Sequence, residues 1–400
     1  MNYQLSDRIN KMSESATLAM AAKARELKAE GKDIISLSLG EPDFKTPQHI
    51  QDAAKKAIDS GKYFAYPPVT GYQDLREAIA EKLTKENGIP SSPEQIVVSN
   101  GAKQSIANVM LALLDPGDEV IVFAPYWVSY AELIKLAEGT PVMITGTLEN
   151  DFKPTADQLK AAITDKTKAI LYSSPCNPTG GVFTQAELDA IADVIKAHED
   201  IIVLSDEIYE HINFTEEGHS SIGAIPGMAE RTVTINGFSK GFAMTGWRVG
   251  YISAPLPIAK AASKVQGQIT SGNCSIAQRA ALAAITEDLQ PTRDMTAIYH
   301  KRRDMVIDLL NEIEGVKTYV PKGAFYIFPD VSYFFGKSDG STTIADADDL
   351  ALYILKEAQV STVTGGAFGA PNCIRLSYAA SDDELKEAMK RLKAVLDKLK

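Results

Sequence analysis

Seven short apolar segments constrain the fold of this 400-residue chain more than any other feature of its sequence. Helical stretches separate several of the segments, which lie at residues 95–99, 119–124, 142–145, 168–173, 201–205, 231–235 and 249–253. Short apolar runs that alternate with helices are typical of a mostly parallel, doubly wound α/β sheet. Ligands of such sheets bind at the carboxyl ends of the strands. We therefore expect functional residues directly after these segments.

Helical periodicity and turn residues organise the rest of the chain. A further strand is predicted at 373–378, and helices at 14–30, 48–60, 72–87, 102–114, 257–268, 275–288, 292–314, 346–358 and 382–399. A short strand is predicted from Ile34, interrupted by Gly40 and Pro42. Strands and helices in the C-terminal part indicate a second, smaller α/β unit, entered through a long helix.

Charge, cysteine usage and hydropathy exclude several classes of protein. The 41 Lys and Arg residues and 52 Asp and Glu residues give a net charge of −11, which opposes binding to nucleic acid or anionic membranes. No segment approaches the ~18 to 20 apolar residues that span a bilayer, and the N-terminus lacks a secretory signal, so a cytoplasmic location is expected. The 3 cysteines lie far apart and the 5 histidines show no ligand spacing, so neither a disulfide framework nor a metal site is predicted.

Lys240 stands in a turn rich in glycine and serine that follows the apolar segment at 231–235. Its neighbours in the sequence are small and apolar, and Arg248 follows in the same stretch. A lysine at the end of a buried strand can have its pKa lowered by desolvation, and it can then act as a nucleophile and base. The ordinary alternative is a solvated loop lysine.

Three other polar or aromatic side chains also follow predicted strands. Asp206 ends an apolar strand, where it could face a ligand or cap the next helix. Asn177 lies in an Asn-Pro-Thr-Gly sequence, which in isolation is a turn. Trp127 follows the segment at 119–124, and a core tryptophan is its ordinary interpretation.

Two parts of the sequence predict binding of anions. Gly101 and Ala102 lie between a predicted strand and a predicted helix, and the unpaired amide groups of a helix N-terminus bind anions. Lys103 follows in the first turn of the predicted helix, where an acidic residue is usually favoured, so its positive charge needs an explanation such as a bound anion. An exposed lysine without a ligand is the alternative. Arg375 lies inside an apolar strand, where its charge is costly unless it pairs with a bound carboxylate or in a structural salt bridge.

The segment from Gly237 to Gly250 resembles, position by position, the cofactor-lysine segment of class I aminotransferases, the aspartate aminotransferase family of pyridoxal-phosphate enzymes. The match covers 14 residues and includes the spacing from Lys240 to Arg248. Three further segments also resemble the family, at residues 39–44, 177–180 and 205–209.

This resemblance implies the type I fold of transferases that depend on pyridoxal 5'-phosphate (PLP). The large domain would span residues 46–290 and contain a seven-stranded, mostly parallel sheet. The small α/β domain would combine residues 1–45 with residues 291–400. PLP is the implied cofactor.

The resemblance also implies three catalytic residues. Lys240 would bind the cofactor covalently and move the Cα proton of the substrate. Asp206 would keep the pyridine nitrogen protonated, which maintains the ring as an electron sink, and Tyr209 would contact the ring's phenolic oxygen. Asn177 would contact the same oxygen and Trp127 would stack on the ring, so both would also lie against the substrate.

For the cofactor phosphate, the resemblance implies the amides of Gly101 and Ala102, the guanidinium of Arg248, and Tyr66 from a neighbouring subunit. The enzyme would then be a homodimer with shared active sites. Many family members carry a hydroxyl residue three positions before the lysine, where this chain has Gly237, so one phosphate contact is expected to be missing. Cys176 also departs from many members, and no function is attached to it.

For the substrate, the resemblance implies Arg375 for the α-carboxylate, Gly40 beside the substrate, and Lys103 for the distal carboxylate of aspartate or glutamate. The predicted function is therefore a PLP-dependent aminotransferase that moves an amino group between L-aspartate or glutamate and 2-oxoglutarate or oxaloacetate by a ping-pong mechanism. Its expected partners are small molecules, namely amino acids and 2-oxo acids, with neither nucleic acid nor membrane.

Other functions stay open on the same fold. A transaminase acting on aromatic or prephenate-type substrates would share these residues, as would a C–S lyase, an aminocyclopropane-carboxylate synthase or a decarboxylase. A non-catalytic regulator would be expected to carry an added DNA-binding domain. A nicotinamide enzyme is disfavoured because no Gly-x-Gly-x-x-Gly sequence opens a helix after a strand.

Overall fold

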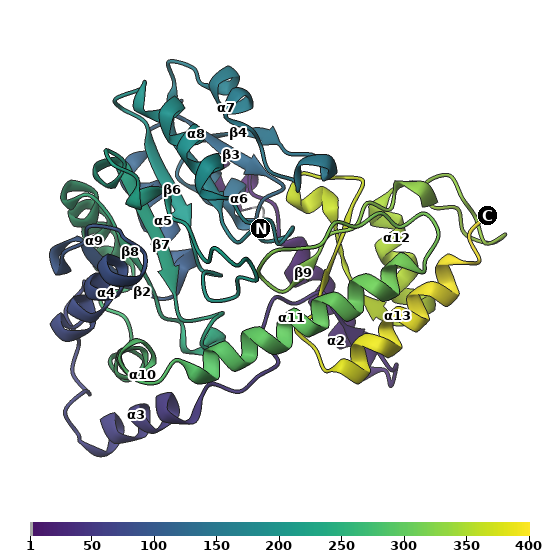
Figure 1. Cartoon of the computed structure of the whole chain (residues 1–400), viewed down its shortest axis with the longest axis horizontal. Coiled ribbons are helices and arrows are strands. Elements are labelled where there is room, and N and C mark those ends of the chain that lie inside the picture. The colour runs from purple at the N-terminus through teal and green to yellow at the C-terminus, as the bar shows by residue number, and fades with distance from the viewer. Residues whose placement is uncertain (1–2) are drawn as a thin grey trace.

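The computed structural model describes residues 3–400, and its main sheet contains seven strands: β2 (Ile96–Ser99), β3 (Glu119–Ala124), β4 (Thr140–Thr145), β5 (Thr167–Ser173), β6 (Ile202–Asp206), β7 (Thr232–Gly237) and β8 (Gly250–Ser253). Their order across the sheet is β2-β8-β7-β6-β5-β3-β4 (Figure 1). All neighbouring strands pair in parallel except β8, which runs antiparallel to β2 and β7. The predicted strands and their mostly parallel arrangement are confirmed, with ends that differ by about two residues at most.

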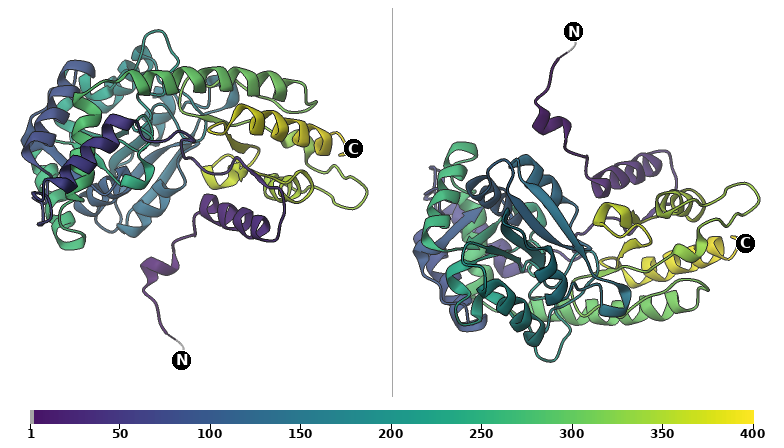
Figure 2. Two further views of the ribbon diagram at one scale, coloured as in Figure 1. Left: turned by 90° about the horizontal axis from the view of Figure 1, so that it is seen from below. Right: turned by 90° about the horizontal axis from the view of Figure 1, so that it is seen from above.

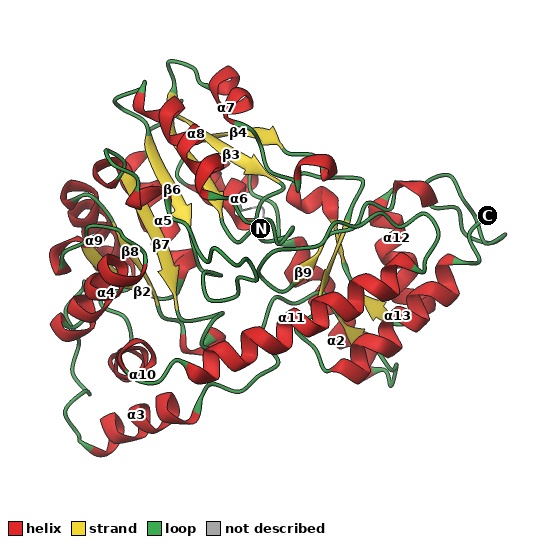
Figure 3. Cartoon of the chain, viewed as in Figure 1, coloured by secondary structure: helices red, strands yellow, loops and turns green. Residues whose placement is uncertain are grey.

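Helices cover both faces of the main sheet because alternate residues of a strand point to opposite sides. In β3, Val120 and Val122 join one hydrophobic cluster, whereas Ile121 and Phe123 join another. The first cluster lies against α5 (Ala102–Leu113), α6 (Ser129–Leu136) and α9 (Leu256–Ile269), and the second against α7 (Ala156–Ala162) and α8 (Gln185–Lys196). A third cluster packs the β2–β8 edge against α3 (Gln48–Asp59), α4 (Gln73–Glu86) and α10 (Ser275–Thr286) (Figure 3).

Two small sheets lie beside the C-terminal helices. One is antiparallel, in the order β11 (Val363–Thr364), β12 (Ile374–Ser377) and β9 (Tyr326–Ile327). In the other, β1 (Ile35–Ser36) pairs in parallel with β10 (Val360–Ser361). The helices of this part are α2 (Ala16–Ala29), α11 (Gln290–Asn311), α12 (Ala347–Tyr353) and α13 (Asp382–Leu396). The pairing of β1 with β10 places an N-terminal segment within the C-terminal part of the molecule.

One long helix and one short arm are visible from several sides. The 22 residues of α11 extend about 33 Å and connect the region of the main sheet to that of the small sheets (Figure 1). The N-terminal arm, which carries α1 (Asp7–Asn10), projects from the body of the chain (Figure 2). Within residues 3–400, the helices include none with the length and hydropathy to cross a membrane.

Some elements differ from their predicted bounds. The strand predicted from Ile34 is limited to the two residues of β1. The helix predicted at 346–358 is α-helical only to Tyr353 and continues as a π-helical turn over Ile354–Ala358. The short helices α1, α6, α7 and α8 were not among the predicted ones.

The carboxyl ends of the central strands lie side by side. Ser173 of β5 pairs with Asp206 of β6, and Asp206 pairs with Ile235 of β7. The turns that follow these strands therefore leave the sheet at a common edge, and they carry Asn177 and Lys240.

Candidate active site

A cavity of about 460 Å³ lies where these turns meet the start of α5 and the small sheets. Every predicted site residue lines this cavity except Gly101 and Tyr66. Gly40 and Arg375 reach it from opposite ends of the sequence. The structure therefore brings the predicted residues to one site.

Lys240 lies in the turn after β7, with its amine against the N-terminal segment. Its Nζ donates a hydrogen bond to the carbonyl oxygen of Gly40, and it lies 5.7 Å from the ring centre of Tyr209. Burial lowers the pKa of the Lys240 amine to about 8, an effect that Glu41 opposes. A lysine with this pKa exchanges protons near neutral pH, as the sequence context predicted.

Asp206 is buried at the end of β6 and accepts two hydrogen bonds. Tyr130 Oη donates to its Oδ2 at 2.6 Å, and the amide of Ile208 donates to its Oδ1 at 3.2 Å. Burial raises the pKa of Asp206 to about 6, and both hydrogen bonds oppose the rise. The carboxylate is therefore mostly ionised at neutral pH. A turn follows β6, so Asp206 does not cap a helix.

Arg375 is 1% exposed and lies in β12. Its guanidinium donates to Oδ1 of Asn177 at 2.8 Å and to the carbonyl oxygen of Ser38 at 2.6 Å, while its Nε has no partner. Within residues 3–400 we find no ion pair to this arginine, whose electrostatic neighbours are the phenols of Tyr326 and Tyr209. A buried cation without a counter-ion is costly. A bound carboxylate would supply the missing charge.

The N-terminus of α5 forms a corner suited to an anion. The Arg248 guanidinium packs so closely on Gly101 that a Cβ there would collide with it. Arg248 donates to the carbonyl oxygens of Thr245 at 2.9 Å and Asn100 at 3.3 Å, which holds it beside the helix. The amide of Gly101 donates to Ser99 at 2.8 Å, so in this structure it is not directed at the cavity as predicted. The amides of Ala102 and Lys103 remain for an anion.

Lys103 and Trp127 both line the cavity. The Lys103 ammonium lies 4.9 Å from the centre of the Trp127 ring. Burial lowers the pKa of this lysine, and the Arg248 cation adds to the effect. Although much of its side chain is exposed, Lys103 lines the cavity and presents its charge to it.

Gly237 cannot be replaced by a hydroxyl residue without moving the sheet. A Cβ at Gly237 would lie 2.8 Å from Cα of Gly250 and 2.9 Å from the carbonyl oxygen of Val249. Ser239, directly before Lys240, lines the cavity and offers a hydroxyl group there. Tyr66 is 94% exposed and does not line the cavity of its own chain.

Besides Ser239, three residues of the site were missed in the sequence. Tyr130 bonds Asp206, and Tyr326 lies with its hydroxyl 2.7 Å from that of Tyr209. Asn273 donates to Oδ1 of Asn100 at 2.7 Å and to the carbonyl oxygen of Arg248 at 2.8 Å, which holds the anion corner together. None of the three directly follows a predicted strand or has a distinctive spacing, so no sequence signal marks these contacts.

A second polar cluster lies behind Asp206. Ligand atoms of Glu207, Glu210 and His219 lie within 4.8 Å of one another, a grouping that could hold a metal ion and that the sequence did not predict. The Lys82 ammonium forms an ion pair with Glu210, and His219 Nε2 lies 2.8 Å from Glu207 Oε2. The carboxylates are already paired within the protein, so we assign no metal to the cluster.

The cavity thus combines four chemical functions. Lys240 offers an amine that can attack an aldehyde, and Asp206 offers a carboxylate that can hold a protonated ring nitrogen. The α5 N-terminus with Arg248 fits a phosphate, and Arg375 fits a carboxylate. This set of groups fits a phosphorylated aldehyde cofactor together with an amino acid.

The model of the aminotransferase class I and II family matches residues 32–392, so the chain belongs to this family. An aspartate/prephenate aminotransferase from Cereibacter sphaeroides is 45% identical over 392 residues, 98% of each chain. The solved aspartate aminotransferase from Rhizobium meliloti has a TM-score of 0.96 at 40% identity, covering 100% of both chains. That from Thermus thermophilus, solved with maleate, has a TM-score of 0.92 at 41% identity, covering 98% of this chain and 100% of that one. These similarities confirm the predicted family and fold.

Proposed function

We propose that this chain is a PLP-dependent aminotransferase that moves an amino group between L-aspartate or glutamate and 2-oxoglutarate or oxaloacetate. One observation carries the proposal: the Lys240 amine and the Asp206 carboxylate line one cavity with two cations, Arg375 and Lys103. The amine and the carboxylate suit the cofactor. The two cations suit the two carboxylates of a dicarboxylic amino acid.

The residues that would hold PLP come from four parts of the fold. Lys240 would bind it covalently, Asp206 would pair with the ring nitrogen, and Tyr209 and Asn177 would face the phenolic oxygen. Trp127 covers the ring. The phosphate contacts are the amide of Ala102, the Arg248 guanidinium and the Ser239 hydroxyl, which takes the place of the hydroxyl that Gly237 lacks. When bound, PLP supplies the electron sink that accepts the electron pair released at the substrate Cα.

The chain's own groups bind the substrate and move its proton. Arg375 binds the α-carboxylate, which supplies the counter-ion that this buried guanidinium lacks. Lys240 Nζ, with a pKa of about 8, would accept the proton from the substrate Cα and deliver it to the cofactor's aldehyde carbon. The Asp206 carboxylate would keep the ring nitrogen protonated, since its pKa of about 6 leaves it ionised at neutral pH.

Lys103 would select dicarboxylic substrates by binding the distal carboxylate. Its ammonium lies 4.9 Å from the Trp127 ring centre and has Arg248 as its electrostatic neighbour, with no carboxylate contributing to its pKa shift. Maleate, which accompanies the Thermus thermophilus relative, is a four-carbon dicarboxylate and supports this selection.

Prephenate, which is a 2-oxo acid, is the second candidate acceptor of the amino group. The relative from Cereibacter sphaeroides carries prephenate as well as aspartate in its name. Prephenate also has two carboxylates, so Arg375 and Lys103 suit it as they suit aspartate.

We further propose that two copies of the chain share their active sites. Tyr66 and Phe64 are 94% and 71% exposed on one loop, outside the cavity of their own chain. The Tyr66 hydroxyl would complete the phosphate site of the second copy. The division into a large domain at 46–290 and a small domain at 1–45 with 291–400, and the cytoplasmic location, remain predictions from the sequence.

The direct test is a transamination assay with the PLP-loaded protein. Aspartate with 2-oxoglutarate should give oxaloacetate and glutamate in equal amounts, and Lys240→Ala, purified in parallel, should give none. A panel of the amino donors glutamate, phenylalanine and alanine, with prephenate tested as an acceptor for the amino group of aspartate, ranks the substrates. Release of ammonia or pyruvate without an acceptor would instead identify a lyase, and no turnover with any donor would contradict the proposal.

A further inference from the structure

Tyr326 links three parts of the site although the predicted chemistry gives it no role. It is 1% exposed in β9, and its hydroxyl lies 2.7 Å from the hydroxyl of Tyr209. Its ring lies 4.5 Å from the guanidinium carbon of Arg375. A Cβ at Gly40 would collide with the same hydroxyl. The phenol is therefore held in place from three directions.

The Arg375 cation acts on both tyrosines of the Tyr209–Tyr326 hydrogen bond. Burial raises the pKa of both phenols, that of Tyr209 well above its ordinary value, and the Arg375 cation opposes the rise in each case. The hydrogen bond can run in either direction, and we take the one in which Tyr326 Oη donates to Tyr209 Oη. The proton of Tyr209 is then free to point into the cavity.

We propose that Tyr326 is a positioning residue that donates to Tyr209 and so orients the Tyr209 hydroxyl towards the cofactor. The inference rests on the proposed function, in which Tyr209 faces the phenolic oxygen of PLP. A donor that is itself hydrogen-bonded as an acceptor donates more strongly. Tyr326 thus strengthens the contact that stabilises negative charge on that oxygen.

This role predicts a spectroscopic effect of a single hydroxyl group. Stabilising the ring's negative oxygen lowers the pKa of the chromophore formed by PLP and Lys240. Tyr326→Phe removes the donor to Tyr209 and should raise that pKa by about half to one unit, the size expected for one hydrogen bond. The charged groups that face Lys240, namely Glu41, Arg375, Arg248 and Asp206, are unchanged in this variant.

Tyr378→Phe is a matched control. Tyr378 is also 1% exposed, belongs to the same hydrophobic cluster, and donates to the carbonyl oxygen of Ala324 at 2.9 Å. Its loss removes a buried tyrosine hydroxyl without touching Tyr209. It should lower thermal stability and leave the chromophore pKa unchanged.

The experiment is a pH titration of the visible absorbance of the PLP-loaded protein, with circular dichroism to confirm folding. Wild type is compared with Tyr326→Phe, Tyr378→Phe, Tyr209→Phe and the Tyr209→Phe/Tyr326→Phe double variant. The double variant should titrate like Tyr209→Phe alone, because Tyr326 acts only through Tyr209. An unchanged pKa in Tyr326→Phe, an equal shift in Tyr378→Phe, or additive shifts in the double variant would overturn the inference.

Failure of the proposed function gives a different result. If PLP does not bind covalently to Lys240, wild type itself shows no visible band and no adduct after borohydride reduction. If the band is present and titrates identically with and without the Tyr326 hydroxyl, only the positioning role is wrong.

Discussion

The hydroxyl of Tyr130 donates a hydrogen bond of 2.6 Å to Oδ2 of Asp206. Both side chains are buried, at 1% and 3% exposure, so the bond is shielded from water. A bond to the charged form of a carboxylate lowers its pKa. Tyr130 therefore helps to keep Asp206 ionised although burial alone favours protonation.

Removing this bond should shift the pH at which the protein loses its cofactor. In Tyr130→Phe the pKa of Asp206 should rise from about 6 by about half to one unit. Because only the ionised carboxylate holds a protonated ring nitrogen, PLP affinity should begin to fall at a higher pH on acidification. The dissociation constant of PLP, measured across acidic and neutral pH, checks this. Tyr172→Phe, which removes a buried hydroxyl bonded to Ser205, is the control, and equal profiles for both variants would contradict the role of Tyr130.

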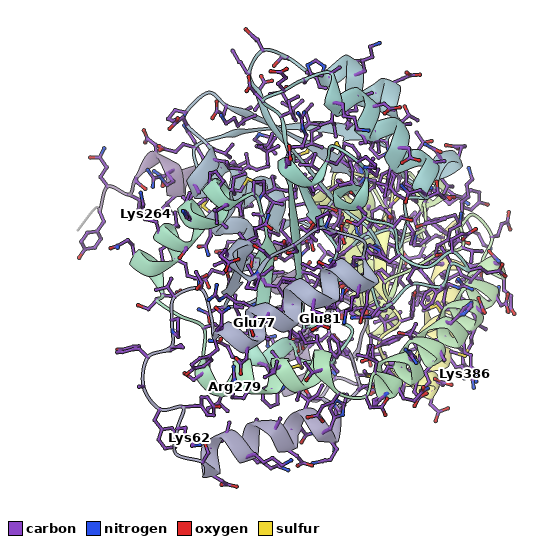
Figure 4. All side chains as sticks on the ribbon, turned by 60° about the vertical axis from the view of Figure 1, so that its left-hand side comes forward. Lys62, Glu77, Glu81, Lys264, Arg279 and Lys386 are labelled. Carbon is purple, nitrogen blue, oxygen red and sulfur yellow. The ribbon has the colours of Figure 1, made fainter. Side chains whose placement is uncertain are left out.

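Lys103 should determine selectivity for a distal carboxylate. Lys103→Ala should lower kcat/KM for aspartate by about 10-fold to 100-fold, the value of a charged hydrogen bond, and leave alanine nearly unaffected. Lys264→Ala on the exposed side of α9 is the control, since Lys264 lies outside the cavity (Figure 4). If aspartate and alanine lose activity in equal proportion, Lys103 does not bind the distal carboxylate.

Arg375 should act on every amino acid alike. Arg375→Lys keeps a positive charge but loses the planar pair of donors that fits a carboxylate. We expect kcat/KM to fall by about 100-fold for aspartate and for alanine, because both carry the α-carboxylate. Steady-state kinetics with both donors check the prediction, and a loss confined to aspartate would show that the roles of Arg375 and Lys103 are exchanged.

The Lys82–Glu210 ion pair should stabilise the fold behind the site. Both side chains are 6% exposed, and Lys82 with His211 and His219 holds the pKa of Glu210 well below its usual value despite burial. Lys82→Met leaves a buried carboxylate without its main partner and should lower the free energy of unfolding by about 3–5 kcal/mol at neutral pH. The difference should shrink as the pH falls below about 4, where the carboxylate of the unfolded chain is protonated.

Urea unfolding of Lys82→Met and Lys85→Met measures this effect with an internal control. Lys85 lies on the same helix and pairs with Glu81, which is labelled in Figure 4. The side chains of Lys85 and Glu81 are 71% and 61% exposed. An exposed pair contributes about 0.5 kcal/mol or less. Equal urea midpoints for the two variants would show that the buried pair adds no stability.

The sequence predicts the strands and the residues that directly follow them, because buried parallel strands are continuous apolar runs. Asp206 and Lys240 were found in this way, with the family resemblance supplying their roles. The contacts of Tyr130 with Asp206 and of Tyr326 with Tyr209 join residues 76 and 117 positions apart. Such contacts depend on how helices and sheets pack, which no local pattern specifies. The two-residue strands β9, β10 and β11 are likewise too short to give a periodic signal.

The direction of the Gly101 amide group is a second feature that the sequence does not specify. Its place before a predicted helix indicated an anion contact, yet its hydrogen bond to Ser99 directs it elsewhere. A strand-to-helix turn fixes where amide groups occur, whereas their directions follow from dihedral angles such as the φ of 83° at Gly101.

Borohydride reduction of the PLP-loaded protein, followed by peptide mass spectrometry, tests most directly whether Lys240 is the covalent cofactor site. We predict a phosphopyridoxyl group on the peptide that contains Lys240, and loss of that label in Lys240→Ala. A label on another lysine, or an unmodified Lys240 in protein that retains full transaminase activity, would contradict the assignment.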